Sequence, residues 1–191
     1  MGPRIKGAAF REFLRWYAPR FPDRLAAVAR DLPDVRLDPD KDGAGVLASS
    51  WYSAASVHAT IDALLAGLAS RQRAELARGA GRATLERTLT GVYRLLFQIM
   101  ATPERYARHA QRLWDGYYDT GTITIDVGPG RAESRIAGWA AHHPFICEMH
   151  VHAAACIYEN MRLEGVVSNR RECVALGGTV CRIETTWRTG P

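Results

Sequence analysis

Apolar residues in the first 118 positions recur mostly with the period of an α-helix. Positions 5–32 predict two short helices that are separated by Pro19 and Pro22. Positions 32–45 are rich in Asp, Pro and Gly, so they cannot sustain an apolar face and predict a surface loop. The chain therefore begins with helices that are joined by polar turns.

Further helices follow in the same half. Apolar residues at 57, 61, 64, 65 and 68 predict a long amphipathic helix, and Gly79 and Gly81 are expected to separate it from the next one. The segment 85–100 is apolar on more than one side, which predicts a central buried helix. Thr102 and Pro103 are typical of the first positions of another helix, which carries Trp114. Three serines are candidate N-caps for the first of these helices: Ser49, Ser50 and Ser53.

The apolar period changes from helical to two after Gly121. Positions 123–127 alternate between apolar and polar residues, and Gly-Pro-Gly at 128–130 predicts a turn between two strands. A helix is predicted over 144–163, followed by a hairpin around Gly177 and Gly178. This order predicts an α+β fold in which helices cover an antiparallel sheet. We expect one domain over 1–191, mainly helical over 1–118 and strand-rich over 119–191.

Composition and charge narrow the classes of function. The chain has 191 residues and a formal net charge of +5, and all of its basic residues except Lys6 and Lys41 are arginines. These arginines are interspersed with acids and form no basic run, so nucleic acid is not an expected partner. No stretch is apolar enough for a membrane span or a signal peptide, which predicts a cytoplasmic protein.

Four cysteines, Cys147, Cys156, Cys173 and Cys181, lie in the last quarter of the chain. Without a secretion signal a disulfide framework is not expected, which leaves buried thiols or a metal site. A three-residue hairpin connection would place the cysteines at 173 and 181 opposite one another, about 5 Å apart. Cys147 starts the preceding helix, where free backbone N–H groups favour a thiolate.

Three sulfur atoms suit zinc, which takes four tetrahedral ligands. The spacing leaves the fourth ligand open, and the alternative to a metal is that the cysteines are small buried apolar residues. The candidates for the fourth position are Glu172, Glu148, Cys156, His142, His143, His150 and His152.

Short motifs carry a resemblance to a known family. The segment 172–187, ECVALGGTVCRIETTW, resembles the C-terminal signature of 4-vinyl reductase domains. KGAAF at 6–10, SWY at 50–52 as the start of a helix, and YDTGT at 118–122 resemble an uncharacterised myxobacterial family related to those domains. The resemblance implies a fold shared with vesicle-tethering TRAPP subunits and haem nitric-oxide-binding domains, with an apolar cavity between helices and sheet.

The resemblance also implies site residues. Phenol-sensing regulators of the family bind zinc through cysteines spaced as Cys147, Cys173 and Cys181 are. Their additional ligand, a Glu three residues before the second cysteine, is replaced here by Arg170, so Glu172 would have to substitute. Their aromatic pocket residues do not map onto this chain, so phenol itself is not an expected ligand. The candidates for lining the cavity, each of which can instead serve core packing, are Trp51, Tyr52, Tyr93, Phe97, Trp114 and Trp139.

Haem is not an expected cofactor, although related domains bind it through a helical histidine. His109 is the candidate iron ligand on the helix after Thr102. The Tyr-x-Ser-x-Arg motif that holds the haem propionates in those domains is missing, and Glu133-Ser134-Arg135 is only a fragment of it. We therefore expect zinc and not haem, if the chain holds a metal.

Three classes of function remain. The favoured one is a non-catalytic sensor domain that binds a small apolar molecule and signals to a protein partner. The alternative is an interaction module, without an exchangeable ligand, that forms a homodimer or docks partners. An enzyme is the least favoured class, because the chain has no nucleophile elbow, phosphate loop, zinc-protease motif or nicotinamide fingerprint.

Overall fold

A computed structural model describes residues 2–31, 36–90 and 102–189, and it has the predicted α+β architecture. The N-terminal part contains the strands β1 (Arg4–Lys6) and β2 (Trp51–Ser53), which pair in antiparallel fashion. Its helical elements are α1 (Gly7–Tyr17), α2 (Pro22–Asp31), the short η1 (Asp42–Gly45), α3 (Ala54–Leu65) and α4 (Ser70–Thr90). The sequence predicts neither of these short strands, and Trp51 and Tyr52 of the SWY motif lie in β2 instead of starting a helix.

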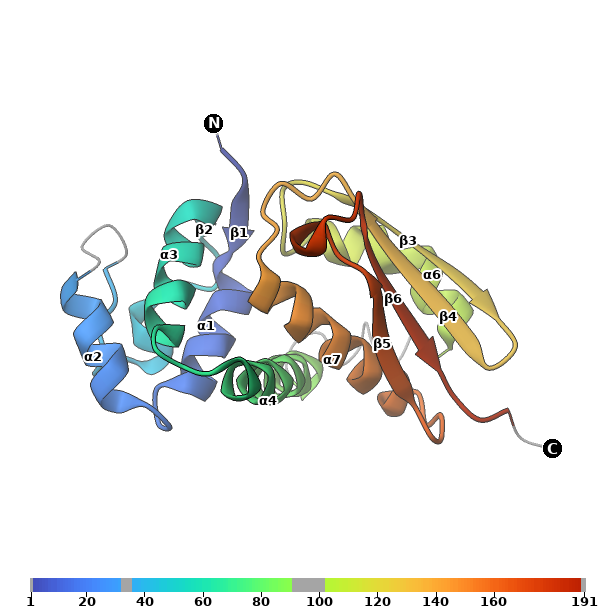
Figure 1. Cartoon of the computed structure of the whole chain (residues 1–191), viewed down its shortest axis with the longest axis horizontal. Helices are drawn as coiled ribbons and strands as arrows, with labels where there is room; N and C mark the ends of the chain where they lie inside the picture. The colour runs from blue at the N-terminus through green and yellow to red at the C-terminus, as the bar shows by residue number, and fades with distance from the viewer. Residues whose placement is uncertain (1, 32–35, 91–101, 190–191) are drawn as a thin grey trace.

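The C-terminal part contains a four-stranded antiparallel sheet and two helices (Figure 1). The strand order is β3-β4-β6-β5, and helix α7 packs between this sheet and α4. The elements are α6 (Pro103–Asp115), β3 (Thr122–Gly128), β4 (Arg131–Ala137), α7 (Pro144–Asn160), β5 (Val167–Glu172), the short η2 (Val174–Leu176) and β6 (Cys181–Thr186).

The predicted helix starts are confirmed. The Ser53 side chain accepts a hydrogen bond from the Ser56 backbone N–H and caps α3. Thr102 caps α6 in the same way, with Pro103 in the first turn. Both caps satisfy a backbone donor that has no partner within the helix.

The prediction that Gly79 and Gly81 separate two helices is wrong. Helix α4 runs through both glycines, and the break lies at Gly67, whose φ is +72°. A Cβ on Gly79 would lie 2.5 Å from the Trp16 ring, and one on Gly81 would lie 2.4 Å from the Met149 carbonyl oxygen. These glycines therefore let α4 pack closely against α1 and α7.

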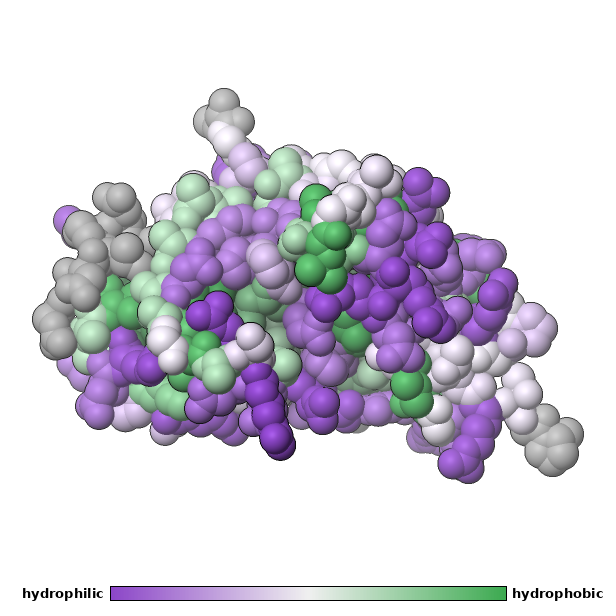
Figure 2. All heavy atoms as spheres, in the orientation of Figure 1, coloured by the Kyte–Doolittle hydropathy of each residue, from purple (hydrophilic) through white to green (hydrophobic). Residues whose placement is uncertain are grey.

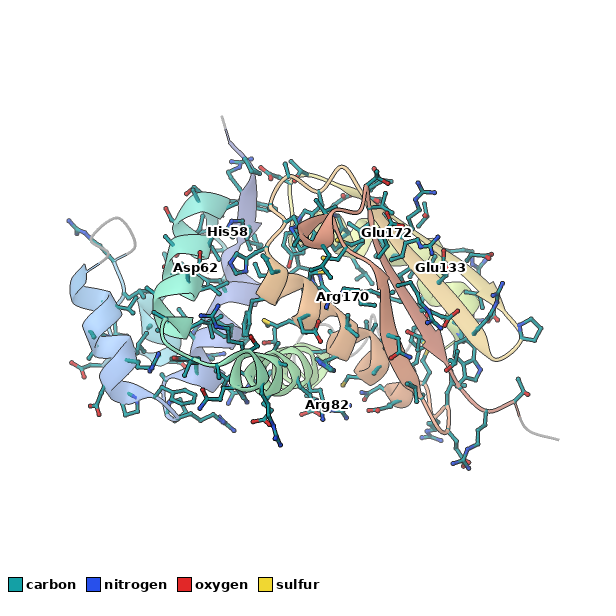
Figure 3. The ribbon with its side chains drawn as sticks, in the orientation of Figure 1. His58, Asp62, Arg82, Glu133, Arg170 and Glu172 are labelled. Carbon is teal, nitrogen blue, oxygen red and sulfur yellow. The ribbon has the colours of Figure 1, made fainter. Side chains whose placement is uncertain are left out.

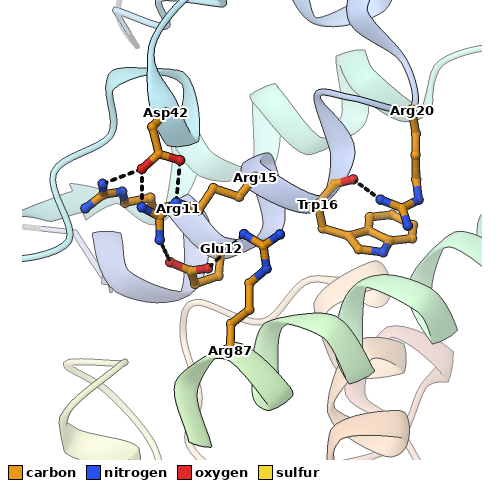
Figure 4. Close-up of polar contacts among 7 residues, drawn as sticks. All are labelled: Arg11, Glu12, Arg15, Trp16, Arg20, Asp42 and Arg87. Atoms are coloured by element: carbon orange, nitrogen blue, oxygen red, sulfur yellow. Dashed lines mark hydrogen bonds and ion pairs between the residues drawn. The ribbon is translucent and has the colours of Figure 1, made fainter. Parts of the chain in front are cut away.

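A cluster of ion pairs joins η1 to α1 (Figure 4). The Asp42 carboxylate accepts hydrogen bonds from Arg15 and, at 2.9 Å, from Arg11. Arg15 also contacts Glu12 at 2.5 Å. The Arg15 guanidinium holds the pKa of the Asp42 carboxyl well below its usual range. These ion pairs anchor the C-terminal end of the segment 32–45, which the sequence predicts to be a loop.

The two parts share one core. Lys6 N–H donates to the Tyr117 carbonyl at 2.8 Å, and Ile5 forms a β-bridge with Tyr118. Buried residues form a continuous apolar cluster from Ile5 to Cys181. None of the described helices has both the length and the apolar character needed to cross a membrane.

The final hairpin differs from its prediction in one respect. The strands end at Glu172 and resume at Cys181, so η2 and the turn at Gly177 replace a three-residue connection. Glu172 pairs with Arg182, which still leaves the two hairpin cysteines facing one another across the end of the sheet. Helices α6 and α7 cover one face of the sheet, where the buried residues of β4 and β6 are Ala132, Ser134, Ile136, Cys181, Ile183 and Thr185.

Candidate functional site

A cavity of about 230 Å³ lies between the helices and the covered face of the sheet. Its walls come from both parts of the chain and are overwhelmingly apolar. Helix α7 contributes the most residues, spaced three or four apart along one face. The lining residues on α7 are Ile146, Met149, His150, Ala153, Ala154 and Ile157, and those on the other elements include Phe10, Phe13, Val57, Ile61, Leu85, Tyr106, Ala110, Leu113, Trp114, Tyr118, Ile123, Ile136 and Ile183.

A hydrogen-bonded pair interrupts this apolar wall. The Tyr118 hydroxyl lies 3.0 Å from His150 Nε2, and both residues line the cavity. Burial lowers the pKa of His150 to about 4 and raises the pKa of Tyr118. Both groups are therefore neutral near pH 7. His150 Nδ1 is buried without a hydrogen-bond partner among the described residues.

Two of the predicted lining residues lie at this pair. Trp114 lines the cavity, and its indole N–H donates to the Thr120 carbonyl at 2.9 Å. Trp139 packs behind the wall, with ring centroids 5.2 Å from those of Trp114 and His150. Aromatic side chains thus hold the polar pair in place.

Two other predicted residues lie away from the cavity. Trp51 packs under the Lys6 ammonium, 4.8 Å from the ring centroid. The Tyr52 hydroxyl accepts a hydrogen bond from the Leu47 backbone N–H, and its ring packs on Phe10. The remaining two predicted residues, Tyr93 and Phe97, lie outside the described part of the chain.

The aromatic residues that the sequence suggests account for little of the cavity wall. The cavity is lined mainly by aliphatic and small side chains. The spacing of Ile146, His150, Ala153 and Ile157 on the predicted helix would have indicated the cavity face of α7.

Three cysteines and one histidine converge beside the cavity. The Sγ atoms of Cys147, Cys173 and Cys181 and one ring nitrogen of His142 all lie within 4.8 Å of one another. The Sγ of Cys147 is 3.5 Å from that of Cys173 and 3.7 Å from that of Cys181. His142 Nε2 lies 3.5 Å from the Cys173 Sγ. Sequence spacing had left this histidine as one of seven alternatives for the fourth position.

The separations within this Cys3His cluster fit a tetrahedral metal ion. Zinc–sulfur bonds of about 2.3 Å place two sulfur ligands about 3.8 Å apart. The Cys147 Sγ has both cysteine neighbours at nearly this distance. The three cysteines are 1–2% exposed; Cys147 lies in α7, Cys173 directly follows β5, and Cys181 is the first residue of β6. One ion at this point would join the hairpin to the start of α7.

The hydrogen bond between Cys147 and Cys181 favours a thiolate at Cys181, whereas the sequence predicts one at Cys147. The thiol of Cys147 donates to Cys181, which lowers the pKa of Cys181 below its usual range. The same hydrogen bond, together with burial, raises the pKa of Cys147. A thiolate is the form of cysteine that binds a metal.

Glu172, the predicted substitute ligand, lies outside the Cys3His cluster. Its carboxylate accepts hydrogen bonds from the backbone N–H groups of Thr179 at 2.9 Å and Val180 at 3.4 Å (Figure 3). The hydrogen bond from Thr179 lowers the pKa of this carboxyl. Arg170 pairs with Glu148 at 2.8 Å. Glu172 therefore shapes the hairpin loop, and His142 takes the fourth position of the cluster.

Trp139 lies between the cluster and the cavity. Its ring meets the edge of the His142 ring, with centroids 5.3 Å apart, and also contacts Tyr118 at 5.0 Å. Cys147 and His150 lie three residues apart on α7, so one helix turn carries a residue of each site. The metal candidate and the cavity consequently share a wall.

H-NOX domains are among the solved structures that are similar to this chain in fold. The Fe(II) unliganded H-NOX protein from K. algicida has a TM-score of 0.67 and 12% identity over 97% of both chains. The S. oneidensis H-NOX protein in the Fe(II)NO ligation state has a TM-score of 0.60 and 11% identity over 96% of this chain and 99% of its own. A Tt H-NOX variant has a TM-score of 0.65 and 8% identity over 96% and 95%.

No protein-family model and no curated protein matches the chain. The likeness to the H-NOX structures confirms the expected relation to haem nitric-oxide-binding domains at the level of the fold. The resemblances to 4-vinyl reductase domains and TRAPP subunits gain no support from a family match and stay predictions.

Another similar structure is described by its haem distortion in the H-NOX family. The described residues of this chain do not fit haem. His109 is exposed on α6 and does not line the cavity, unlike Tyr106 and Ala110 of the same helix. His150 lines the cavity, but its Nε2 is engaged with Tyr118. Among the described lining residues there is no arginine or lysine that could pair with haem propionates.

Proposed function

We propose that this chain is a non-catalytic sensor domain that binds a small neutral apolar molecule in its cavity. The observation that carries the proposal is the apolar cavity of about 230 Å³ between helices and sheet. A cavity of about 150 Å³ with aliphatic and aromatic walls stays free of water and binds benzene. A larger cavity with walls of the same kind suits a molecule of one or two rings.

The charge state of the wall supports a neutral ligand. His150 and Tyr118 are uncharged near pH 7, and no acidic or basic side chain is found among the described lining residues. An ionised ligand would lose its hydration without gaining a partner. The likeness to H-NOX structures, one of which is described with nitric oxide bound to its iron, supports small-molecule sensing on this fold.

We also propose that the Cys3His cluster holds one zinc ion with a structural role. The spacing of its donor atoms supports this assignment, and so does the hydrogen bond from Cys147, which lowers the pKa of Cys181. Four protein ligands would leave no open position for a substrate. His142, Cys147, Cys173 and Cys181 would hold the ion, which would fix the final hairpin against α7.

The test of the sensor proposal is a panel of neutral apolar compounds, such as toluene, indole and naphthalene, with thermal unfolding and native mass spectrometry as readouts. The variant Ala154→Leu fills the cavity, and Ala155→Leu adds the same bulk at a neighbouring position that does not line it. We expect at least one compound to raise the Tm of the wild type and of Ala155→Leu but not of Ala154→Leu. The proposal is wrong if no compound binds or if Ala154→Leu binds as well as the wild type.

A further inference from the structure

The uncovered face of the four-stranded sheet carries its charges in rows. On this face Asp126 of β3 lies opposite Glu133 of β4, which lies opposite Glu184 of β6. Two residues further along the strands, Arg135 of β4 lies opposite Arg182 of β6. An acidic row and a basic row therefore run side by side across the strands, about 7 Å apart.

Like charges directly opposite one another on a sheet are destabilising, so each row needs compensation. Within the chain Glu184 pairs with Arg171, and Arg182 lies 3.6 Å from Glu172. Glu133 and Arg135, at the middle of the face, have no ion-pair partner among the described residues. Both rows thus offer unmatched charge at the same place.

This face is open in the structure. Its side chains are exposed or half-buried, and helices α6 and α7 cover the opposite face. Hydrophilic residues gather over β5 and β6 in Figure 2, and Glu133 is labelled on the sheet in Figure 3. Nothing in the described part of the chain packs over the two rows.

The face that carries the two rows is self-complementary in charge. A two-fold axis that runs across the strands, between the rows, turns a second copy over and exchanges the rows. Each Glu133 then faces Arg135 of the second copy, and each Glu184 faces its Arg182. Two sheets can stack in this way about 10 Å apart with their strands nearly aligned. A face of this kind matches a second copy better than a partner of a single charge sign.

We propose that two copies of this chain associate through the uncovered sheet face, with the acidic row of each copy on the basic row of the other. The contact is isologous, because the same patch serves both copies. It uses neither the cavity nor the Cys3His cluster, so it holds whether or not the sensor proposal does.

The test exchanges charges at the two central positions. Glu133→Arg alone places an arginine at both central positions of β4, and Arg135→Glu alone places a glutamate at both. Each single variant then faces like charge in its own homodimer, which is expected to lower the association constant at least about tenfold by sedimentation equilibrium. An equimolar mixture of the two variants restores both ion pairs. Native mass spectrometry should then show heterodimers, since the variants differ in mass.

Two controls separate this contact from other effects. Arg108→Glu makes the same charge change on the exposed side of α6 and should leave the association constant within about twofold of the wild type. Raising the salt concentration should weaken the wild-type dimer. The proposal is overturned if the wild type is monomeric at every concentration, if Arg108→Glu acts like Arg135→Glu, or if mixing the single variants restores no dimer.

Discussion

The Sγ atoms of Cys147 and Cys181 lie 3.7 Å apart, although one starts a helix and the other starts a strand 34 positions later. With Cys173 and His142 they surround a point at which a single ion can bind. Neither the helix nor the hairpin could hold an ion alone, so metal binding and tertiary packing depend on each other.

The first prediction concerns metal content. We expect about one zinc per chain by plasma mass spectrometry in protein purified without a histidine tag. Cys173→Ser and His142→Ala should each lower it strongly, whereas Glu172→Gln should not, because Glu172 binds the backbone of the loop. At free zinc about 100-fold above Kd, chelation should cost about 3 kcal/mol of unfolding free energy. An unchanged zinc content in His142→Ala would exclude the histidine as the fourth ligand.

The second prediction concerns pH. The folded pKa of His150 is about 4, whereas an unfolded histidine titrates near 6.5. The unfolded chain therefore gains a proton first as the pH falls, and stability drops between about pH 7 and pH 4 by up to about 3 kcal/mol. His150→Gln should remove that part of the slope in denaturant titrations, while the exposed His109→Gln should keep it. Equal slopes in all three proteins would contradict the buried neutral imidazole.

The third prediction concerns the packing of α4. Gly81→Ala gains helix propensity, but the new methyl group would meet the Met149 carbonyl oxygen at 2.4 Å. We expect a net loss of about 1–3 kcal/mol. Gly79→Ala should cost less, because its methyl group meets the Trp16 side chain and not backbone. Arg78→Ala on the exposed side of α4 is the control and should change stability by less than about 0.5 kcal/mol.

The fourth prediction concerns haem. Addition of haem to the purified protein should give no Soret band with an axial histidine ligand, because His109 is exposed and His150 is bonded to Tyr118. A Soret band in the wild type that His109→Ala abolishes would refute this prediction.

Local features of the fold could be predicted from the sequence. Ser53 and Thr102 mark helix starts because a side-chain oxygen can cap free backbone N–H groups within three residues. The alternation at 123–127 fixes a strand because successive side chains point to opposite faces. Gly79 and Gly81 show the limit of such reasoning, since a glycine that admits a neighbouring helix has the same local pattern as one that ends a helix.

The candidate site also has some features that follow from the sequence and others that only the tertiary structure shows. The sequence by itself determined that Cys173 and Cys181 flank a hairpin turn and that Cys147 lies at the start of the preceding helix, because these follow from residue type, apolar period and turn residues. Only the tertiary structure decided that His142 and not Glu172 completes the cluster, and that His150 and Tyr118 form the polar pair of the cavity. Tyr118 and His150 are 32 positions apart, and His142 and Cys173 are 31 apart, so which of them meet depends on how the helices pack on the sheet.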